Sequence, residues 1–321
     1  MDFTYLIIAF GGGLLASMVG AINSFIFVSV VAIAAILGGA AGAPAIGLIA
    51  FGPVFGPHVA FAGAVAAAAF AMTRNHLENG SDIVTPLNKF GDPTVLIVGG
   101  IFGMIGYLLD YILSDIVGSF LFTGLLGDNA TGWTDSIALS ILISAFIVRL
   151  VFGKTGLTGK FPEGEKRTYF PTGSRLGFLI VMGLGLGILF GGVVVALGTF
   201  SLETGSAEVT YLFNMMPLLA FALGGFGLLF IVMGIDCEAW FHISYPATTT
   251  AVILFSANQN SVAAIIGAVV AGIVSALLGA LFHNLLDTNV DTHINAPVCS
   301  IVVVQTINFL IIGGLITPAL M

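Results

Sequence analysis

The densest group of side chains suited to acid–base or metal chemistry lies in the stretch FHNLLDTNVDTHINAPVCS, residues 282–300. Its polar members of interest are His283, Asp287, Asp291, His293 and Asn295. If the preceding helix continues, His283, Asp287 and Asp291 lie on one helical face, one turn apart. Imidazole and carboxylate groups bind divalent cations such as Zn²⁺, Mn²⁺ or Ni²⁺, and His also exchanges protons near neutral pH. The alternative is an ordinary solvated loop at a helix end.

A second group lies in GIDCEAWFHISYPATTT, residues 234–250. Asp236 and Glu238 have no Lys or Arg near them in the sequence, and two unpaired carboxylates at a pore mouth would concentrate cations. His242 follows Glu238 by four residues and shares its face if the helix has begun. The structural alternative is that the acidic residues complement the dipole of a helix N-terminus.

The elements that position these residues are predicted to be membrane helices. Only 7% of the residues are charged, 58% are hydrophobic and the mean hydropathy is +1.12, whereas a soluble domain is about 25% charged. Apolar runs of about 20 residues recur along the chain, the length that a helix needs to cross a bilayer. They lack the alternation of barrel strands, so we predict an all-α polytopic integral membrane protein. The net charge of -8 argues against nucleic-acid binding.

Hydropathy predicts about ten transmembrane helices. They are residues 3–20, 21–40, 56–72, 94–113, 134–152, 175–199, 210–235, 239–257, 261–286 and 297–320. The apolar segment 41–57 contains three Pro, which interrupt helices. We expect it to be broken or re-entrant, as membrane proteins allow where backbone lines a cavity; a plain extracellular loop is the alternative.

The positive charges predict the orientation in the membrane. All eight Lys and Arg lie in or next to two loops, 73–93 and 149–175. Positively charged loops stay in the cytoplasm, so a ten-span protein of the cell membrane has both termini outside. Arg149 lies near the cytoplasmic end of a predicted span, and we expect its side chain to snorkel to the surface.

Two short motifs recur in the same order in both halves of the chain. They are LGG at 37–39 and 223–225, and LLD at 108–110 and 285–287. His58 lies between the first-half motifs and His242 between the second-half motifs. We predict two five-helix repeats, residues 1–152 and 175–321, joined by a cytoplasmic connector at 153–174. An odd number of spans inverts the second repeat, as in many secondary transporters.

The repeat adds residues of the first half to the candidate site. His58 follows two Gly-Pro dipeptides, and Asp110 lies within the apolar run YLLDYILSD. We expect His58, Asp110, His242 and Asp287 to form one pseudo-symmetric set, because ionisable groups at membrane depth usually mark a pathway. A satisfied structural role for the lone His58 is the alternative.

The expected function is that of a permease, a secondary transporter or channel for a small polar solute or cation, with possible proton or cation coupling. The expected pathway residues are His58, Asp110, Asp236, Glu238, His242, His283, Asp287, Asp291, His293 and Asn295. The chain has no Walker motif, no nucleotide or other cofactor is expected, and an enzyme is not the first expectation. The alternatives are a metal-dependent intramembrane hydrolase, with ligands among His283, Asp287, Asp291 and His293, and the membrane subunit of a larger complex. A homo-oligomer in the lipid bilayer is compatible with the Gly-rich helices.

Overall fold

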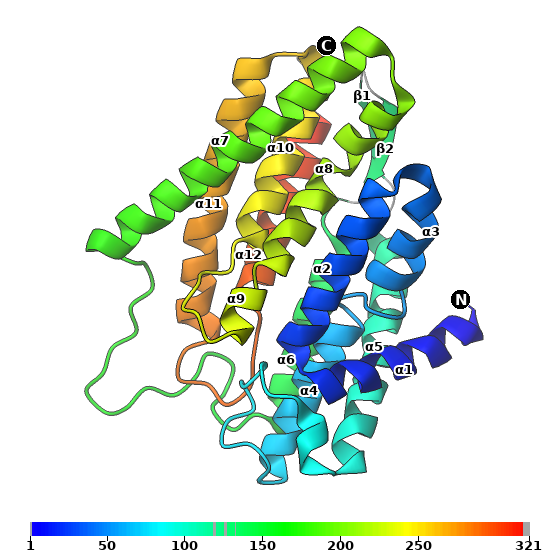
Figure 1. Ribbon diagram of the computed structural model, residues 1–321. Coiled ribbons are helices and arrows are strands. Elements are labelled where there is room, and N and C mark those ends of the chain that lie inside the picture. Colours follow the sequence, from blue (N-terminus) through cyan, green and yellow to red (C-terminus); the bar gives the residue numbers. More distant parts are fainter. Residues whose placement is uncertain (1, 118–119, 125–126, 132, 317–321) are drawn as a thin grey trace.

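The computed structural model describes the backbone of residues 2–117, 120–124, 127–131 and 133–316 (Figure 1). The long helices of the first half are α1 (Phe3–Val19), α2 (Ala21–Leu37), α4 (Ala60–Thr73), α5 (Pro93–Val117) and α6 (Ser136–Phe152). Those of the second half are α7 (Gly173–Thr204), α8 (Ala207–Phe226), α10 (Phe241–Asn258), α11 (Ser261–Leu286) and α12 (Ala296–Thr306), which continues as the π-helical η4 (Ile307–Ile316). A short antiparallel hairpin, β1 (Phe120–Gly124) and β2 (Gly127–Thr131), joins α5 to α6. Each of the ten segments predicted from hydropathy overlaps one of these helices.

Five candidate membrane-spanning helices are present in the described residues. They are Pro93–Ser114, Gly173–Thr204, Ala207–Val232 (which includes α9, Leu229–Val232), Ser261–Leu286 and Ala296–Gly314. The pair α1 and α2 passes the same test only together and is bent by 118°, so it adds at most a sixth span. By length and hydropathy, the protein is therefore a helical membrane protein with five or six candidate spans, fewer than the ten predicted.

The chain between α2 and α4 does not form a continuous helix. Three short turns, η1 (Gly39–Gly42), α3 (Ala43–Ala45) and η2 (Ile46–Ala50), are followed by residues 51–59 without regular helix. Pro removes a backbone donor and clashes with the preceding turn, which agrees with the predicted break at 41–57. In the second half, residues 233–240 between α9 and α10 are also non-helical, and Gly234 adopts a φ of 77° there.

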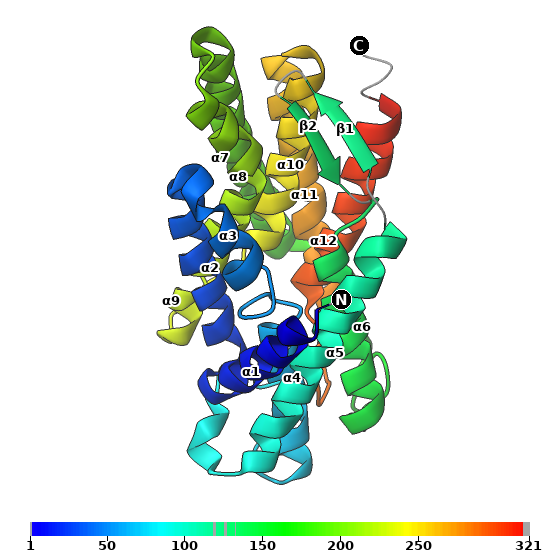
Figure 2. The ribbon, with the colours of Figure 1, turned by 90° about the vertical axis from the view of Figure 1, so that its right-hand side faces the viewer.

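The helices of the two halves pack in a matching pattern. α1 packs against α4 and α5, as α7 packs against α10 and α11. α2 packs against α4 as α8 packs against α10, and α5 against α6 as α11 against α12. Between the halves, α2 packs against α8 and α6 against α12 (Figures 1 and 2).

Glycines bring the paired helices into close contact in both halves. A Cβ atom on Gly13 of α1 would lie 2.3 Å from the backbone oxygen of Gly99 in α5. A Cβ atom on Gly183 of α7 would lie 2.7 Å from the backbone oxygen of Gly272 in α11. Small residues permit such approaches in membranes, where packing rather than water exclusion holds helices together.

An aromatic cluster forms the core where the halves meet. The ring of Phe25 in α2 lies 5.8 Å from that of Phe61 in α4, 5.4 Å from that of Phe221 in α8 and 4.9 Å from that of Phe241 in α10, between centroids. Tilted and edge-on contacts of this kind are the favourable geometries for aromatic pairs. The cluster therefore ties two helices of each half together.

The polar loops at one end of the bundle meet. Asn79, in the loop that also contains η3 (Leu87–Phe90), donates to the backbone oxygen of Val290 at 3.0 Å. The backbone N–H of Lys154 donates to Asp291 Oδ2 at 2.7 Å. The two basic loops thus lie on the same side of the bundle together with residues 287–295, as the charge pattern predicts.

Arg149 corrects one sequence expectation. Its side chain is buried, with only 2% exposed, and does not snorkel to the surface. The guanidinium donates to Thr292 Oγ1 at 2.9 Å, to the backbone oxygen of Thr292, to that of Leu286 at 2.5 Å and to that of Leu157 at 2.9 Å. The last residue of α11 and the loops that follow α6 and α11 supply these acceptors, which nothing in the local sequence indicates.

Candidate functional site

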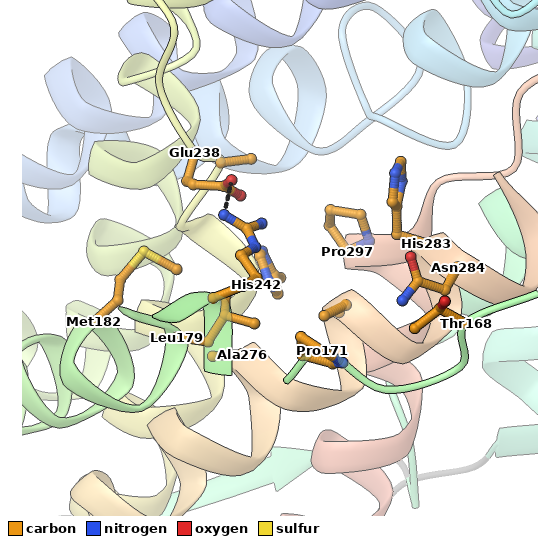
Figure 3. Close-up of a pocket in the computed structure, with 14 residues that line it drawn as sticks. Thr168, Pro171, Leu179, Met182, Glu238, His242, Ala276, His283, Asn284 and Pro297 are labelled. Atoms are coloured by element: carbon orange, nitrogen blue, oxygen red, sulfur yellow. Dashed lines mark ion pairs between the residues drawn. The ribbon is translucent and has the colours of Figure 1, made fainter. Parts of the chain in front are cut away.

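A pocket of about 560 Å³ lies among α7, α10 and α11, and it collects several of the predicted site residues (Figure 3). His242 of α10, His283 of α11 and Glu238 of the preceding loop line it, together with Arg175 of α7. Pro297 at the start of α12 closes one side. The walls also include Leu179 and Met182, so the pocket combines an apolar surface with a few ionisable groups. Such a combination is typical of small-molecule sites.

His242 is held where α10 begins. The helix starts at Phe241, directly after the non-helical residues 233–240. The imidazole is 6% exposed, and its Nδ1 atom has no hydrogen-bond partner among the described residues. The ring lies against α11, because a Cβ atom on Gly279 would come within 2.5 Å of Nε2. A buried polar atom without a partner calls for a water or a ligand.

Glu238 is paired, contrary to the sequence expectation of unpaired carboxylates. Its Oε1 atom lies 2.6 Å from Nη1 of Arg175, in the first turn of α7. Both side chains are partly exposed, so the pair contributes little to stability. The two residues are 63 positions apart (238 − 175), and only the packing of α7 beside α10 brings them together. Asp236, its expected companion, is exposed in the loop.

His283, Asp287 and His293 form a second group at the edge of the pocket. Asp287 Oδ1 lies 3.2 Å from His293 Nδ1, and Oδ2 lies 3.7 Å from His283 Nδ1. Burial raises the pKa of Asp287, but interactions with the nearby imidazoles of His293 and His283 outweigh this effect. The net effect holds the pKa of this carboxyl well below its usual range.

Asp291 does not join this group, which corrects the predicted helical face. α11 ends at Leu286, and Asn289 adopts a φ of 53°, so the helix does not reach Asp291. The Asp291 carboxylate instead accepts from the backbone of Lys154 and from the hydroxyl of Thr155, each at 2.7 Å. In the part of the chain that the structure describes, no three His, Cys, Asp or Glu side chains form a group that could hold a metal ion.

The predicted first-half pair does meet. His58 Nε2 lies 3.9 Å from Asp110 Oδ2, and His58 is 1% exposed. His58 Nδ1 and Asp110 Oδ1 have no hydrogen-bond partner among the described residues. α5 passes close to His58, since a Cβ atom on Gly106 would overlap the backbone oxygen of His58 at 1.6 Å.

The structure therefore divides the predicted site into parts. His58 and Asp110 form one pair, whereas His242 lies in the pocket and Asp287 pairs with His283 and His293. No described contact joins these parts into the expected four-residue set. Asn295 has a structural role, because its side chain accepts from the backbone N–H of Val298 at 3.2 Å and caps α12.

Sequence reasoning missed Asp135 and Tyr245. Asp135 is the N-cap of α6, and its Oδ1 atom accepts from the backbone N–H of Ala138 at 2.8 Å. Its Oδ2 atom accepts from the hydroxyl of Tyr245 in α10 at 3.0 Å. An Asp directly before a long apolar run is a cap signal, but its contact with the other half has no local signature.

The fold and these buried ionisable groups define a polytopic helical membrane protein with polar sites inside the helix bundle. The chain belongs to a family described as a family of unknown function (DUF7973), which matches residues 1–165 and 178–321. It matches no curated protein and no solved structure.

Proposed function

We propose that this protein is a membrane permease, a secondary transporter or channel, that moves a small polar solute or cation. It is built from two inverted five-helix repeats, 1–152 and 175–321, with 153–174 as the connector. The pathway follows the interface between the repeats. The observation that carries this proposal is the matching placement of His58 and His242.

The two His occupy equivalent places. His58 lies near the end of the non-helical residues 51–59, two residues before α4, and His242 is the second residue of α10, directly after the non-helical residues 233–240. Each has a buried Nδ1 atom without a described partner. A glycine of a crossing helix lies against each residue: Gly106 of α5 against the backbone oxygen of His58, and Gly279 of α11 against the imidazole of His242. Half-helices with unwound backbone at an inverted-repeat interface are a common way to build a transport site.

The glycines also align the two repeats more accurately than the LLD motifs do. Asp110 follows Gly106 by four residues, and His283 follows Gly279 by four residues. Gly99 and Gly272 each precede these glycines by seven residues, and both make the close helix contacts of α5 and α11. Asp110 is therefore the counterpart of His283, one helical turn before Asp287.

The helix caps support the same arrangement. Asp135 caps α6 and Asn295 caps α12, the fifth helix of each repeat. The chain bends by 118° between α1 and α2. We therefore assign α1 as the counterpart of α7 and α2 as the counterpart of α8, since the chain also reverses between those two helices. The basic loops at one end of the bundle then face the cytoplasm, and both termini face the outside of the cell membrane.

The test is flux through the purified protein reconstituted into liposomes. The probes are urea and glycerol, followed by vesicle swelling, and radiolabelled Na⁺, Rb⁺ and choline, followed by uptake. At least one probe is expected to cross faster than in protein-free liposomes, and His242→Ala is expected to lower that rate several-fold. Glu203→Gln, at an exposed position in the last turn of α7, serves as the control that retains the rate.

Two results would count against a permease. One is a folded, reconstituted protein that leaves every probe at the protein-free rate. The other is a second polypeptide that co-purifies in fixed stoichiometry and is required for flux, which would identify the chain as a subunit of a larger membrane complex.

A further inference from the structure

A second pocket, of about 200 Å³, lies where the two halves meet. Its lining comes from α2, the η2 segment, residues 51–57 and α6 of the first half, and from α8, α10 and α12 of the second. The three aromatic rings of Phe25, Phe51 and Phe221 line it, together with Tyr245. Asp135 is the ionisable carboxyl group on its wall, and the other described lining residues are apolar or Gly and Pro.

The Asp135 carboxylate is positioned and oriented by two donors. The backbone N–H of Ala138 bonds one oxygen and the hydroxyl of Tyr245 bonds the other. Each carboxylate oxygen has a further lone pair to offer. Among the described residues that line the pocket, none is Lys, Arg or His. In its ionised form, Asp135 would thus have no cationic protein partner among the described lining residues.

The side chains that line this pocket favour one class of ligand over others. A bare anion is repelled by the carboxylate. A hydrated metal ion such as Mg²⁺ or Ca²⁺ needs several oxygen ligands, and the pocket lining offers only one carboxylate and one phenol side chain. A weakly hydrated organic cation is suited to a single carboxylate surrounded by aromatic rings, whose faces attract positive charge.

We propose that this pocket binds a compact organic ammonium ion, with Asp135 as its counter-ion and Phe25, Phe51, Phe221 and Tyr245 as an aromatic cage. The proposal names the substrate class of the permease and rests on the proposed function. Asp135 and Tyr245 come from opposite halves, so an ion bound here contacts both halves at once. Pro57, which lines the pocket, directly precedes His58 in the chain.

The experiment measures binding rather than flux, using the full-length protein in detergent. Choline chloride is titrated while the thermal unfolding midpoint is followed, because a ligand that binds only the folded state raises it. The matched probe is 3,3-dimethylbutan-1-ol, the uncharged isostere of choline, and NaCl and KCl at equal ionic strength control for salt. Choline is expected to raise the midpoint and the three controls are not.

Two variants locate the site. Asp135→Asn keeps a side chain that caps helices as well as Asp does, and it removes the charge; choline is expected to bind roughly tenfold more weakly or worse. Asp2→Asn changes another helix-capping Asp, the N-cap of α1, which is not among the pocket-lining residues, and this variant is expected to bind choline as the wild type does. Phe221→Leu retains an apolar wall without the ring and is expected to weaken choline binding as well.

Four outcomes would overturn the proposal. They are an equal shift with the uncharged isostere, which would indicate a purely apolar pocket; an equal shift with KCl; no choline shift in the wild type; and a choline shift that is unchanged in Asp135→Asn. Choline binding without flux of any probe would refute the permease and leave the ammonium site standing. Flux of another probe without choline binding would refute the ammonium site alone.

Discussion

Gly279 of α11 lies so close to His242 of α10 that a Cβ atom at this glycine would come within 2.5 Å of the imidazole Nε2. The pocket that contains His242 therefore depends on the absence of a side chain at position 279. We expect Gly279→Val to displace the imidazole and to reduce any flux that His242→Ala reduces. We also expect it to lower the free energy of unfolding by about 1–3 kcal/mol, the cost typical of overpacking.

The matched control for this substitution is Gly185→Val in α7, where a Cβ atom would meet nothing within 4 Å. Thermal unfolding and flux measured on both variants separate a local clash from the general effect of Val in a helix. Equal behaviour of the two variants would show that the contact between Gly279 and His242 does not matter.

Arg149 provides a second prediction, on stability. Arg149→Met leaves three backbone carbonyls and the Thr292 hydroxyl without their donor, and unsatisfied buried groups cost about 1–3 kcal/mol each. We expect a large fall in the thermal unfolding midpoint. Arg149→Lys is expected to restore little of the lost stability, because an ammonium group cannot reproduce the planar arrangement of N–H donors of the guanidinium.

Arg74→Met is the comparison for this prediction. Arg74 is 52% exposed and pairs with Asp92 at 3.2 Å, and exposed ion pairs contribute about 0–1 kcal/mol. A fall for Arg149→Met no larger than that for Arg74→Met would argue against the buried hydrogen-bond network as a source of stability.

The hydrogen-bonded carboxylate of Asp291 is expected to make the stability of the protein depend on pH. Burial raises its pKa, but hydrogen bonds from Thr155 and from the backbone N–H of Lys154 outweigh it and leave the pKa below its ordinary value. A lowered folded-state pKa adds stability that is fully present above the unfolded-state pKa of about 3.9 and is lost as the pH falls below it. Asp291→Asn is therefore expected to lower the unfolding midpoint by a few degrees at pH 7, and less as the pH drops below about 4.

The control for this pH series is Asp236→Asn, in an exposed loop. It is expected to follow the wild type at every pH. If Asp291→Asn kept the same deficit at low pH as at pH 7, the ionised carboxylate would not be the source of the stability.

The topology can be checked with the two native cysteines. Cys237 is half-buried in the loop before α10, and Cys299 is buried in α12. A membrane-impermeant maleimide is expected to label Cys237 only from the cytoplasmic side of oriented membrane vesicles. The Cys237→Ser variant is the negative control and shows any labelling of Cys299. Labelling from the opposite side would reverse the orientation that the basic loops predict.

Part of this fold could be read from the sequence because local chemistry determines it. The lack of charge predicts a helical membrane protein, and the Pro residues of 41–57 predict a break in the helices. Helix positions follow from apolar runs whose ends carry Gly, Asn or Asp. The pair of His58 and Asp110 was also expected, although only from the order of weak motifs.

The rest depends on contacts between distant segments. Glu238 meets Arg175 only because α7 lies beside α10, and the loops that bury Arg149 come from elsewhere in the chain. In the proposed repeat, the LLD motif places Asp287 opposite Asp110, whereas the close helix contacts of Gly106 and Gly279 place His283 there, one helical turn earlier. Asp135 reads as an ordinary cap until Tyr245 is placed against it.

The length of α7 has a consequence of its own. Its 32 residues rise roughly 48 Å at 1.5 Å per residue, well beyond a hydrocarbon core of about 30 Å. A helix that exceeds the bilayer tilts or thickens the lipid around it, and α7 runs obliquely across the other helices (Figure 1). Because Arg175 and the first pocket lie at one end of this helix, a thinner or thicker bilayer would change its tilt and move that pocket wall. The lipid chain length thereby becomes a variable that acts directly on the site.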